Sequence, residues 1–305
     1  MTSTKDIVSI VVLTFNEQSQ ISRCIKSSKE LTDEIFIVDS FSTDDTVKIA
    51  ESLGAKVFQK EWMNNHAKQF NWGLENLPVK TEWVLRLDAD EYLTPELASE
   101  ITQKLSTLNK DITGVILKRR VYFMNRWIKH GGYYPTYLLR LWRYGSGKYE
   151  ERWMDEHVKL EHGRTITFEN DFVDDNLNNL TWWTNKHNNY ATREAIDLLN
   201  IKYKFSATVG IDANLSEAQD KRKRWFKENL YTYIPLFIRP FLYFIYRYIF
   251  KLGLLDGIPG LIWHFLQGFW YRFLVDAKIY DIERRAKREK RTIPEVIKEN
   301  YGIEV

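Results

Sequence analysis

Short apolar runs alternate with longer segments of helical periodicity through the first 120 residues of the chain. Residues 7–13 form an unbroken, mostly β-branched apolar run, and shorter runs of the same kind follow at 34–39, 56–59 and 83–87. Runs of this length and composition are typical of buried strands. The segments between them space apolar side chains three and four residues apart, as amphipathic helices do. Strands that alternate with helices predict a mixed, mostly parallel sheet flanked by helices, which is an α/β fold.

Two predicted helices carry recognisable start signals. Thr94-Pro95-Glu96 combines a capping hydroxyl with a proline and an acidic residue in the first turn. After the second apolar run we expect Ser42 or Thr43 to cap a helix whose first turn contains Asp44 and Asp45, because carboxylates there suit the helix dipole. Both signals predict that a helix begins soon after a strand has ended.

The last third of the chain is dense in aromatic and aliphatic side chains but repeatedly interrupted. Residues 231–250 contain two prolines and two arginines, and the turn-rich segment 253–260 separates them from a second apolar run at 261–275. Because charges inside a membrane span are costly, this pattern disfavours a bilayer-spanning helix. Aromatic helices flanked by Lys and Arg suit the headgroup region instead. We expect either a helical region at a membrane surface or a helical subdomain that packs on the sheet.

Two basic clusters, at 221–227 and 284–291, flank these apolar segments. Each cation near an anionic leaflet contributes roughly 1 kcal/mol to the attraction, so the clusters favour the membrane-surface alternative. The predicted organisation is therefore an α/β domain over residues 1–205, followed by a helical, amphipathic, membrane-associating region over residues 206–305.

Composition excludes several classes of protein. The 305 residues include 44 Lys+Arg and 41 Asp+Glu, a net charge of +3, and 44% are hydrophobic, which excludes intrinsic disorder. A single cysteine excludes an intrachain disulfide and a cysteine-based zinc site. The near-neutral charge argues against a surface built throughout for nucleic acid. The apolar run at 7–13 is too short for a membrane span and lacks a signal-peptide cleavage site, so we expect the chain to stay on the cytoplasmic side.

Polar residues gather where the predicted strands end. Asp88-Ala89-Asp90 follows the strand at 83–87, Asp39 ends the strand at 34–39, and Thr14 to Glu17 follow the first strand. Ligands of parallel sheets bind at the carboxyl ends of the strands. Two carboxylates spaced as in Asp88 and Asp90 suit a divalent cation that accompanies a nucleotide diphosphate. Taken alone, the same pair is equally typical of a solvent-facing turn.

Four motifs in this order resemble glycosyltransferase family 2. They are Thr14-Phe15-Asn16-Glu17, Asp39 with Ser42 to Thr46, Lys68 to Asn71 with Gly73, and Asp88-Ala89-Asp90. The resemblance covers roughly residues 7 to 200. It implies the GT-A fold and inverting transfer of a sugar from a nucleotide-diphosphate donor, and it extends to members that build bacterial lipopolysaccharide core, capsule and surface polysaccharide.

The resemblance implies a role in nucleoside binding for the residues after the first two strands. Thr14, Asn16 and Glu17 would line the nucleotide pocket. Asp39 would hold the uracil or the ribose.

The other two motifs would serve the phosphates and a metal ion. Lys68 would lie near the donor phosphates. Asp88 would contact the ribose or the metal, and Asp90 would be the principal ligand of a Mg²⁺ or Mn²⁺ ion.

An inverting transfer also needs a base that takes a proton from the acceptor hydroxyl. Asp155 and Glu156 lie beside Trp153, and an aromatic wall can raise the pKa of a carboxylate toward the working range. Their distance from the Asp88–Asp90 motif resembles that of the family's acidic pair, and we favour Asp155 over Glu156. The alternative is that the two acids cap a strand or pair with Arg152. His157 is expected to order the pair or to approach the metal.

These features predict a metal-dependent hexosyltransferase with a nucleotide-sugar donor, preferably a UDP-sugar, and a lipid-linked or lipopolysaccharide acceptor. It would lie at the cytoplasmic face of the inner membrane as a peripheral protein. One rival is a sugar-nucleotide nucleotidyltransferase, but its first strand should lead into a glycine-rich phosphate loop, and Thr14 to Gln18 contain no glycine. The other is a non-enzymatic protein that binds nucleic acid or a membrane surface through the basic, aromatic tail. Because its basic residues lie beside apolar segments, we expect no nucleic-acid partner.

Overall fold

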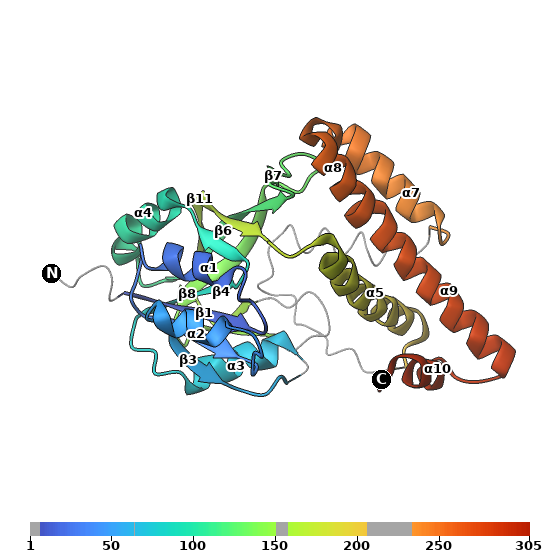
Figure 1. The fold of residues 1–305 in the computed structure, drawn as a ribbon, viewed down its shortest axis with the longest axis horizontal. Coiled ribbons are helices and arrows are strands. Elements are labelled where there is room, and N and C mark those ends of the chain that lie inside the picture. The colour runs from blue at the N-terminus through green and yellow to red at the C-terminus, as the bar shows by residue number, and fades with distance from the viewer. Residues whose placement is uncertain (1–6, 64, 151–157, 206–233) are drawn as a thin grey trace. The chain divides into compact units, whose positions relative to one another are not determined.

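The computed structural model describes residues 7–63, 65–150, 158–205 and 234–305. The chain forms two compact units. The first comprises Met1–Lys129 and Tyr133–Asn178, and the second comprises His130–Gly132 and Asn179–Val305. Figure 1 shows the sheet of the first unit and the long helices of the second. Each unit is described by itself below.

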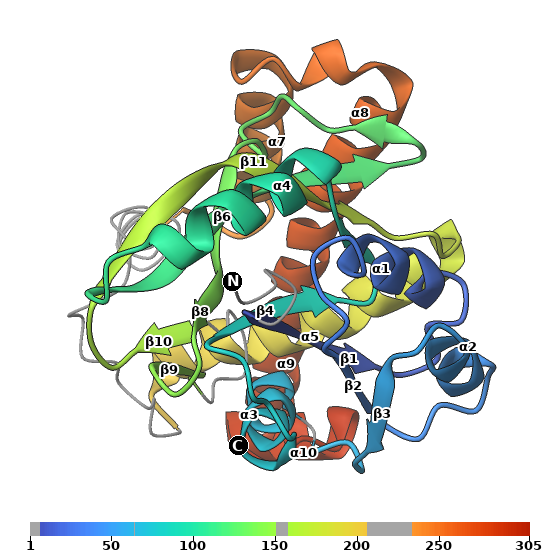
Figure 2. The same cartoon turned by 90° about the vertical axis from the view of Figure 1, so that its left-hand side faces the viewer.

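The first unit is built on a nine-stranded mixed sheet in the order β3-β2-β1-β4-β8-β6-β11-β5, with β7 paired to β6. Figure 2 shows the strands β1 to β4 of this sheet. A further two-stranded sheet pairs β9 with β10. The strands are β1 (Val8–Thr14), β2 (Ile35–Asp39), β3 (Lys56–Gln59), β4 (Trp83–Asp88), β5 (Glu91–Leu93), β6 (Ile112–Phe123), β7 (Arg126–Trp127), β8 (Thr136–Arg143), β9 (Gly147–Tyr149), β10 (Val158–Leu160) and β11 (Arg164–Asp175).

The N-terminal half of this sheet is parallel. Strands β3, β2, β1 and β4 pair in parallel, whereas β8 is antiparallel to both of its neighbours, β4 and β6. The parallel part carries the run of buried β-branched residues that the sequence pattern indicated, with Val8 to Val12 fully buried. The predicted mixed sheet of an α/β fold is therefore confirmed.

Helices cover both faces of the sheet. They are α1 (Ile21–Ser28), α2 (Thr46–Ser52), α3 (His66–Asn76) and α4 (Pro95–Lys104), the last followed by a 3-10 turn at Leu105–Thr107. Helices α1, α2 and α4 share one hydrophobic cluster with the face of β1 that carries Val8, Ile10 and Val12. Helix α3 packs on the opposite face, where Phe70 meets Val11 and Trp142. The predicted covering on both faces is confirmed.

One of the two predicted helix starts is confirmed and the other is wrong. The side chain of Thr94 accepts a hydrogen bond from the Leu97 amide, and Pro95 opens α4. Helix α2, in contrast, begins only at Thr46. Ser42 does not cap this helix, because its amide and hydroxyl both bind the carboxylate of Asp39.

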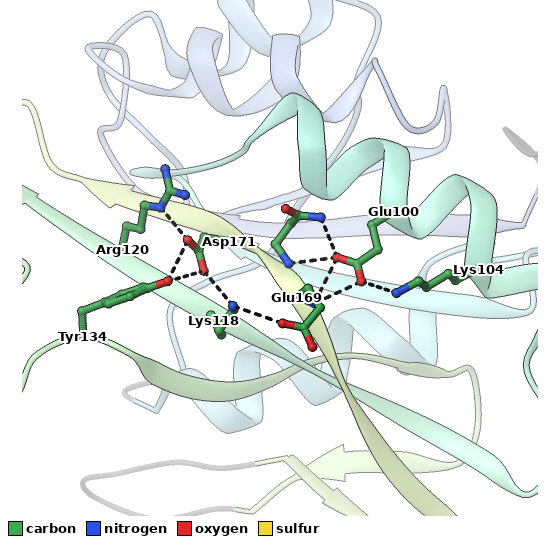
Figure 3. A network of polar contacts seen from close by, with 8 residues as sticks. Glu100, Lys104, Lys118, Arg120, Tyr134, Glu169 and Asp171 are labelled. Carbon is green, nitrogen blue, oxygen red and sulfur yellow. Dashed lines mark hydrogen bonds and ion pairs between the residues drawn. The ribbon is translucent and has the colours of Figure 1, made fainter.

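A polar network fixes the long strands β6 and β11 to each other and to α4 (Figure 3). Asp171 on β11 is almost fully buried and accepts hydrogen bonds from Arg120 on β6 and from the hydroxyl of Tyr134. Glu100 on α4 accepts from the backbone amides of Glu169 and Asn170. A buried carboxylate is tolerated only when it is satisfied in this way, so the network specifies how these elements pack.

The second unit is helical in its described part. Its helices are α5 (Leu180–Tyr203), α7 (Ile238–Ile245), the π-helical turn η4 (Tyr246–Phe250), the 3-10 turn η5 (Gly253–Asp256), α8 (Gly257–Trp263), the π-helical turn η6 (His264–Trp270), α9 (Tyr271–Glu289) and α10 (Ile293–Tyr301). Ala191, Ala195 and Leu199 of α5 share an apolar core with α9 and α10. Among the described residues, no single helix is long and apolar enough to cross a bilayer. The bent pair Ile238–Phe250 and Gly253–Glu289 passes that test together, with a 70° bend.

Candidate active site

The register of the parallel strands brings the predicted site residues to one edge of the sheet. Thr14 at the end of β1 pairs with Asp39 at the end of β2. On the other side of β1, Leu13 pairs with Asp88 at the end of β4. Three carboxyl-terminal strand ends therefore lie next to one another, as binding sites on parallel sheets require.

Asp39 is the best-fixed acid at this edge. Its side chain is fully buried and accepts a hydrogen bond from the Thr14 hydroxyl at 2.9 Å. The amide and the hydroxyl of Ser42 donate to it at 2.8 and 2.5 Å, and Gln59 donates at 3.4 Å. Because each oxygen has at least two donors, the carboxylate is held in one orientation without a cation.

The loops after β1 and β2 are tied to each other. The amide of Asn16 donates to the Ser42 hydroxyl at 2.8 Å, and the amide of Thr43 donates to Asn16 Oδ1 at the same distance. The amide of Glu17 donates to the Thr46 hydroxyl at 2.7 Å. Asn16 has a φ of +57°, a left-handed conformation that asparagine tolerates better than most residues. These bonds bring Asn16 and Glu17 together with Asp39.

Two large aromatic side chains are exposed on these same loops. Phe15 is 57% exposed and Phe41 is 49% exposed, next to the buried Thr14 and within two residues of Asp39. Such a flat apolar face beside fixed polar groups is suited to stacking on a planar ring.

Asp88 is held between two arginines. Its Oδ1 accepts from Arg86 Nε and Nη2 at 3.1 and 3.0 Å, and its Oδ2 accepts from Arg140 Nη2 at 3.2 Å. Burial by itself would raise the pKa of Asp88, but the positive charges of Arg86, Arg140 and His66 outweigh it and hold that pKa far below its usual range. The carboxylate is therefore ionised, and guanidinium groups occupy both of its oxygens.

Glu91 is a second acid that binds Arg140, and it is more deeply buried than Asp88. It is 1% exposed, accepts from Arg140 Nη2 at 2.6 Å and accepts from the backbone amide of Asp88 at 2.9 Å. Burial raises the pKa of Glu91 to about 8; Arg140 opposes this rise, and the nearby charges of Asp88, Asp174 and Asp90 reinforce it. Arg140 thus bridges two acids that belong to one turn.

Asp90 differs from Asp88 in its surroundings. It is half-buried, and its Oδ2 accepts a hydrogen bond from Asn176 Nδ2 at 2.9 Å. The backbone carbonyl of Asp90 also accepts from the amide of Asp175. Asn176 therefore orients the carboxylate and engages one of its two oxygens through a neutral donor.

The carboxylate of Asp90 suits a hard divalent cation that a nucleotide helps to bind. In the part of the chain that the structure describes, no three His, Cys, Asp or Glu side chains are grouped to hold a metal ion. Mg²⁺ in nucleotide sites is typically held by one or two carboxylates, with substrate phosphates and water completing the shell. Asp90 fits that pattern, whereas the arginines already neutralise Asp88.

Lys68 lies in the first turn of α3, where its side chain is exposed and its amide donates to the capping Asn65 side chain at 2.8 Å. The neighbouring Gln69 reaches Ser40 Oγ, at the end of β2, at 3.4 Å and the Lys60 carbonyl at 3.1 Å. The N-terminus of α3 thus adjoins the strand-end cluster through Gln69.

Asp155 and Glu156, together with His157, lie outside the described residues, in the segment that joins β9 to β10. Tyr149, the last residue of β9, exchanges two hydrogen bonds with the side chain of Asn71 on α3, at 2.8 and 2.9 Å. The guanidinium of Arg86 lies over the Tyr149 ring, 4.5 Å from its centre. The segment that carries the predicted base therefore starts beside the arginine that binds Asp88.

Sequence reasoning missed Arg86, Arg140 and Glu91 as parts of this site. A signal for the arginines was present, because each interrupts an otherwise apolar strand, in Val84-Leu85-Arg86-Leu87 and Leu138-Leu139-Arg140-Leu141. A charge within a buried strand needs a partner. The sequence does not say which acid that partner is.

Comparison with known proteins gives a family match. The model of the family described as "Glycosyl transferase family 2" matches residues 9–176. An uncharacterized glycosyltransferase of Rickettsia conorii is 46% identical over 104 residues, which are 34% of this chain and 36% of that protein. The chain thus matches about a third of the length of this relative.

Two further similarities extend over nearly the whole chain. The lipopolysaccharide core biosynthesis glycosyltransferase LpsC of Rhizobium meliloti is 28% identical over 300 residues, covering 95% of this chain and 97% of LpsC. Among solved structures, residues 1–349 of S. aureus TarS align with a TM-score of 0.44 at 15% identity, covering 93% of this chain and 92% of that TarS chain.

Proposed function

Because the chain belongs to glycosyltransferase family 2, we propose that it transfers a hexose or related sugar, with inversion, from a nucleotide-diphosphate donor to a lipid-linked acceptor. Membership of the family confirms the resemblance drawn from the sequence motifs. The observation that carries the proposal is the convergence of Asp39, at the end of β2, with Asp88 and Asp90, at and just after the end of β4, on the two sides of β1.

Asp39 and the loops around it form the nucleoside side of the proposed donor site. Its carboxylate is fixed before any ligand arrives, so binding a ribose hydroxyl or a uracil N–H would require little reorganisation. Phe15 and Phe41 expose aromatic faces at the same place and suit stacking against a base. A uridine nucleotide is the donor that we favour.

Asp90 is the residue that we assign to a Mg²⁺ or Mn²⁺ ion. Bound there with the donor, the ion would neutralise the pyrophosphate and so stabilise it as a leaving group. Asn176 keeps the Asp90 carboxylate in place. We assign to Asp88 a positioning role, because its charge is already shared with Arg86 and Arg140.

Asp155 or Glu156 would act as the base. In an inverting transfer the acceptor oxygen attacks the anomeric carbon as its proton passes to the carboxylate, while the bond to the pyrophosphate oxygen breaks. The support for this assignment is the anchor of the segment at Tyr149, which Asn71 and Arg86 hold beside the end of β4.

We assign the acceptor class and the cellular location from the relatives of this chain and from its aromatic, basic C-terminal region. LpsC carries the description lipopolysaccharide core biosynthesis glycosyltransferase. We therefore assign this chain to bacterial surface glycan synthesis, with a lipid-linked or lipopolysaccharide acceptor. A peripheral position at the cytoplasmic face of the inner membrane would give it both the soluble donor and the lipid acceptor.

The test is release of UDP from a panel of UDP-sugars, measured with purified protein, Mn²⁺ and a bacterial lipid extract. We expect lipid-dependent UDP release that falls at least ~100-fold in Asp155→Asn or Glu156→Gln, since general base catalysis contributes 10²–10⁴-fold. Glu161→Gln, an exposed acid just beyond β10, is the matched control and should remain active. Consumption of UTP with a sugar 1-phosphate, without lipid-dependent transfer, would instead support a nucleotidyltransferase.

A further inference from the structure

The helix α7 and the turn η4 that continues it turn their apolar side outward. The exposed side chains recur every three or four residues along one face and are 49% to 72% exposed: Ile238, Phe241, Leu242, Tyr246, Ile249 and Phe250. In a water-soluble domain this stripe would face the core.

The polar side of the same helix faces inward. Arg239 is 4% exposed and donates from Nε to the fully buried Asp276 of α9 at 2.8 Å. Arg247 donates from Nε to the carbonyl oxygen of Gly131 at 2.5 Å, and Arg272 of α9 lies 4.1 Å from the centre of the Tyr243 ring. The amphipathic pattern of α7 is therefore inverted, with charges inside and hydrocarbon outside.

The break between η4 and α8 continues the apolar surface around a turn, which we call the hairpin tip (residues 249–261). Leu252, Leu254, Leu255, Ile258 and Leu261 are 43% to 74% exposed there. From residue 241 to residue 270 the chain has three charged residues, against ten in the 19 residues of α9. Surface patches of contiguous large apolar side chains mark sites of interaction.

The one acidic side chain of the hairpin tip is satisfied from within the second unit. Asp256 is 1% exposed and accepts from the amide of His130 at 2.9 Å, with His130 Nδ1 2.6 Å from its second oxygen. His264 is fully buried, and a side chain at Gly131 or Gly253 would collide with its ring. Internal pairing of this kind is what a hydrocarbon environment demands. It also gives the segment His130-Gly131-Gly132 a role, because that segment fills the inside of the hairpin.

We propose that the hairpin tip and the outer stripe of α7 insert into one leaflet of a membrane and return, without crossing it. The arm Ile238–Phe250 has 13 residues, about 20 Å at 1.5 Å per residue. That length exceeds one leaflet of a hydrocarbon core about 30 Å thick but does not span the core. After the 70° bend, Phe265 and Phe269 of η6 pack against Phe244 of the arm, so the chain returns alongside it.

Lipid fits this surface better than a second copy of the chain. The exposed residues run along one helix face and then around the turn. A protein partner would need a concave surface that encloses the whole tip, whereas acyl chains adapt to any convex shape. Lys251, the single exposed charged residue from 241 to 270, has a long side chain that can reach anionic headgroups. Tyr243 and Tyr246, each close to a cation, suit the interface. This inference deepens the membrane location proposed above and is independent of the donor site.

Depth-dependent fluorescence quenching on the full chain tests the proposal. Cys24 is buried and burial raises the pKa of its thiol well above its usual range, so a thiol-reactive NBD dye would label only an introduced cysteine. The variants are Ile258→Cys at the tip and Leu180→Cys, an exposed residue of α5, as the matched control. Vesicles of phosphatidylcholine and phosphatidylglycerol carry either a spin label deep in the acyl chain or none.

We expect the dye at residue 258 to brighten about twofold or more with vesicles, to be quenched by the deep spin label and to be shielded from aqueous iodide. The dye at residue 180 should show none of these changes. In parallel, Ile258→Lys should weaken vesicle co-sedimentation about tenfold or more, and Leu180→Lys should leave it unchanged.

Vesicle binding without deep quenching would overturn insertion while leaving a peripheral location intact. Shielding of residue 258 that grows with protein concentration in the absence of vesicles would overturn it in favour of self-association. Loss of nucleotide binding would bear on the proposed activity alone.

Discussion

Arg140 organises the candidate site, although none of the sequence motifs includes it. It rises from β8, is 7% exposed in its side chain, and binds Asp88 and Glu91, which lie at the end of β4 and the start of β5. Removing one partner from a buried ion pair leaves the other charge without compensation, and that is costlier than the pair itself is stabilising. Arg140 therefore fixes the turn from which Asp90 projects.

Replacing this arginine should destabilise the protein strongly. Arg140→Met keeps the aliphatic part of the side chain but leaves Glu91 and Asp88 without their shared cation, so we expect the free energy of unfolding to fall by about 3–5 kcal/mol. Urea titration followed by circular dichroism measures this loss. Arg164→Met is the matched control, because Arg164 and Asp111 form an exposed pair worth less than about 1 kcal/mol. Equal losses in both variants would contradict the account.

The sequence predicted some members of the candidate site and not others, for a physical reason. Asp39 and Asp88 were predictable because they end apolar strands, and strand ends of a parallel sheet converge whatever the details. Asp88 binds Arg86 on its own strand, β4, and Arg140 on β8, which lies 52 residues further along the chain. Nothing in the local sequence indicates that β8 pairs with β4 in an antiparallel direction, so the contact between Asp88 and Arg140 could be found only from the structure.

At the scale of elements, α3 links the nucleoside side of the site to the segment that carries the proposed base. Its first turns reach the end of β2 through Gln69, and one face holds β9 through the paired bonds between Asn71 and Tyr149. A side-chain amide that satisfies both the N–H and the C=O of one residue fixes its backbone as a strand partner would. Asn71 is thus a positioning residue.

Loss of this clamp should reduce catalysis rather than donor binding. Asn71→Ala would release β9, and a shift of the order of 1 Å in a catalytic group costs about 10²-fold, so we expect kcat to fall about 10- to 100-fold with an unchanged Kd for UDP. Steady-state kinetics and calorimetry separate the two. Asn76→Ala removes a side-chain bond to Trp72 at the other end of the same helix and should leave kcat within about twofold of its original value. A loss of UDP affinity in Asn71→Ala would place this residue in the donor site instead.

Element boundaries show where local sequence signals stop being sufficient. The cap at Thr94 was predictable because the hydroxyl serves only its own helix. Ser42 carries the same local signal, but the buried Asp39 competes for its hydroxyl and amide, and α2 begins four residues later. A tertiary hydrogen bond to a buried acid outweighed a helix cap, which is worth about 1 kcal/mol.

At the scale of the whole molecule, the two units follow opposite rules of burial. The first unit has an apolar interior and hydrogen-bonded acids at one edge of its sheet. The second unit buries Arg239, Asp256 and Asp276 near its hairpin and exposes hydrocarbon. The sequence indicated the aromatic, basic character of this region, but the inward orientation of its charges depends on contacts with α9 and with residues 130–132.

Metal-dependent nucleotide binding tests the central claim most directly. Calorimetric titration of UDP into the purified full chain would be run with Mn²⁺ and again after chelation, on the original protein, on Asp90→Ala and on Asp111→Ala. We predict that UDP binds with Mn²⁺, and that chelation or Asp90→Ala weakens the affinity about tenfold or more, a loss of at least about 1.4 kcal/mol. The exposed Asp111 should be dispensable. UDP affinity unaffected by chelation and by Asp90→Ala would contradict the assignment of this strand-end cluster as a metal-assisted donor site.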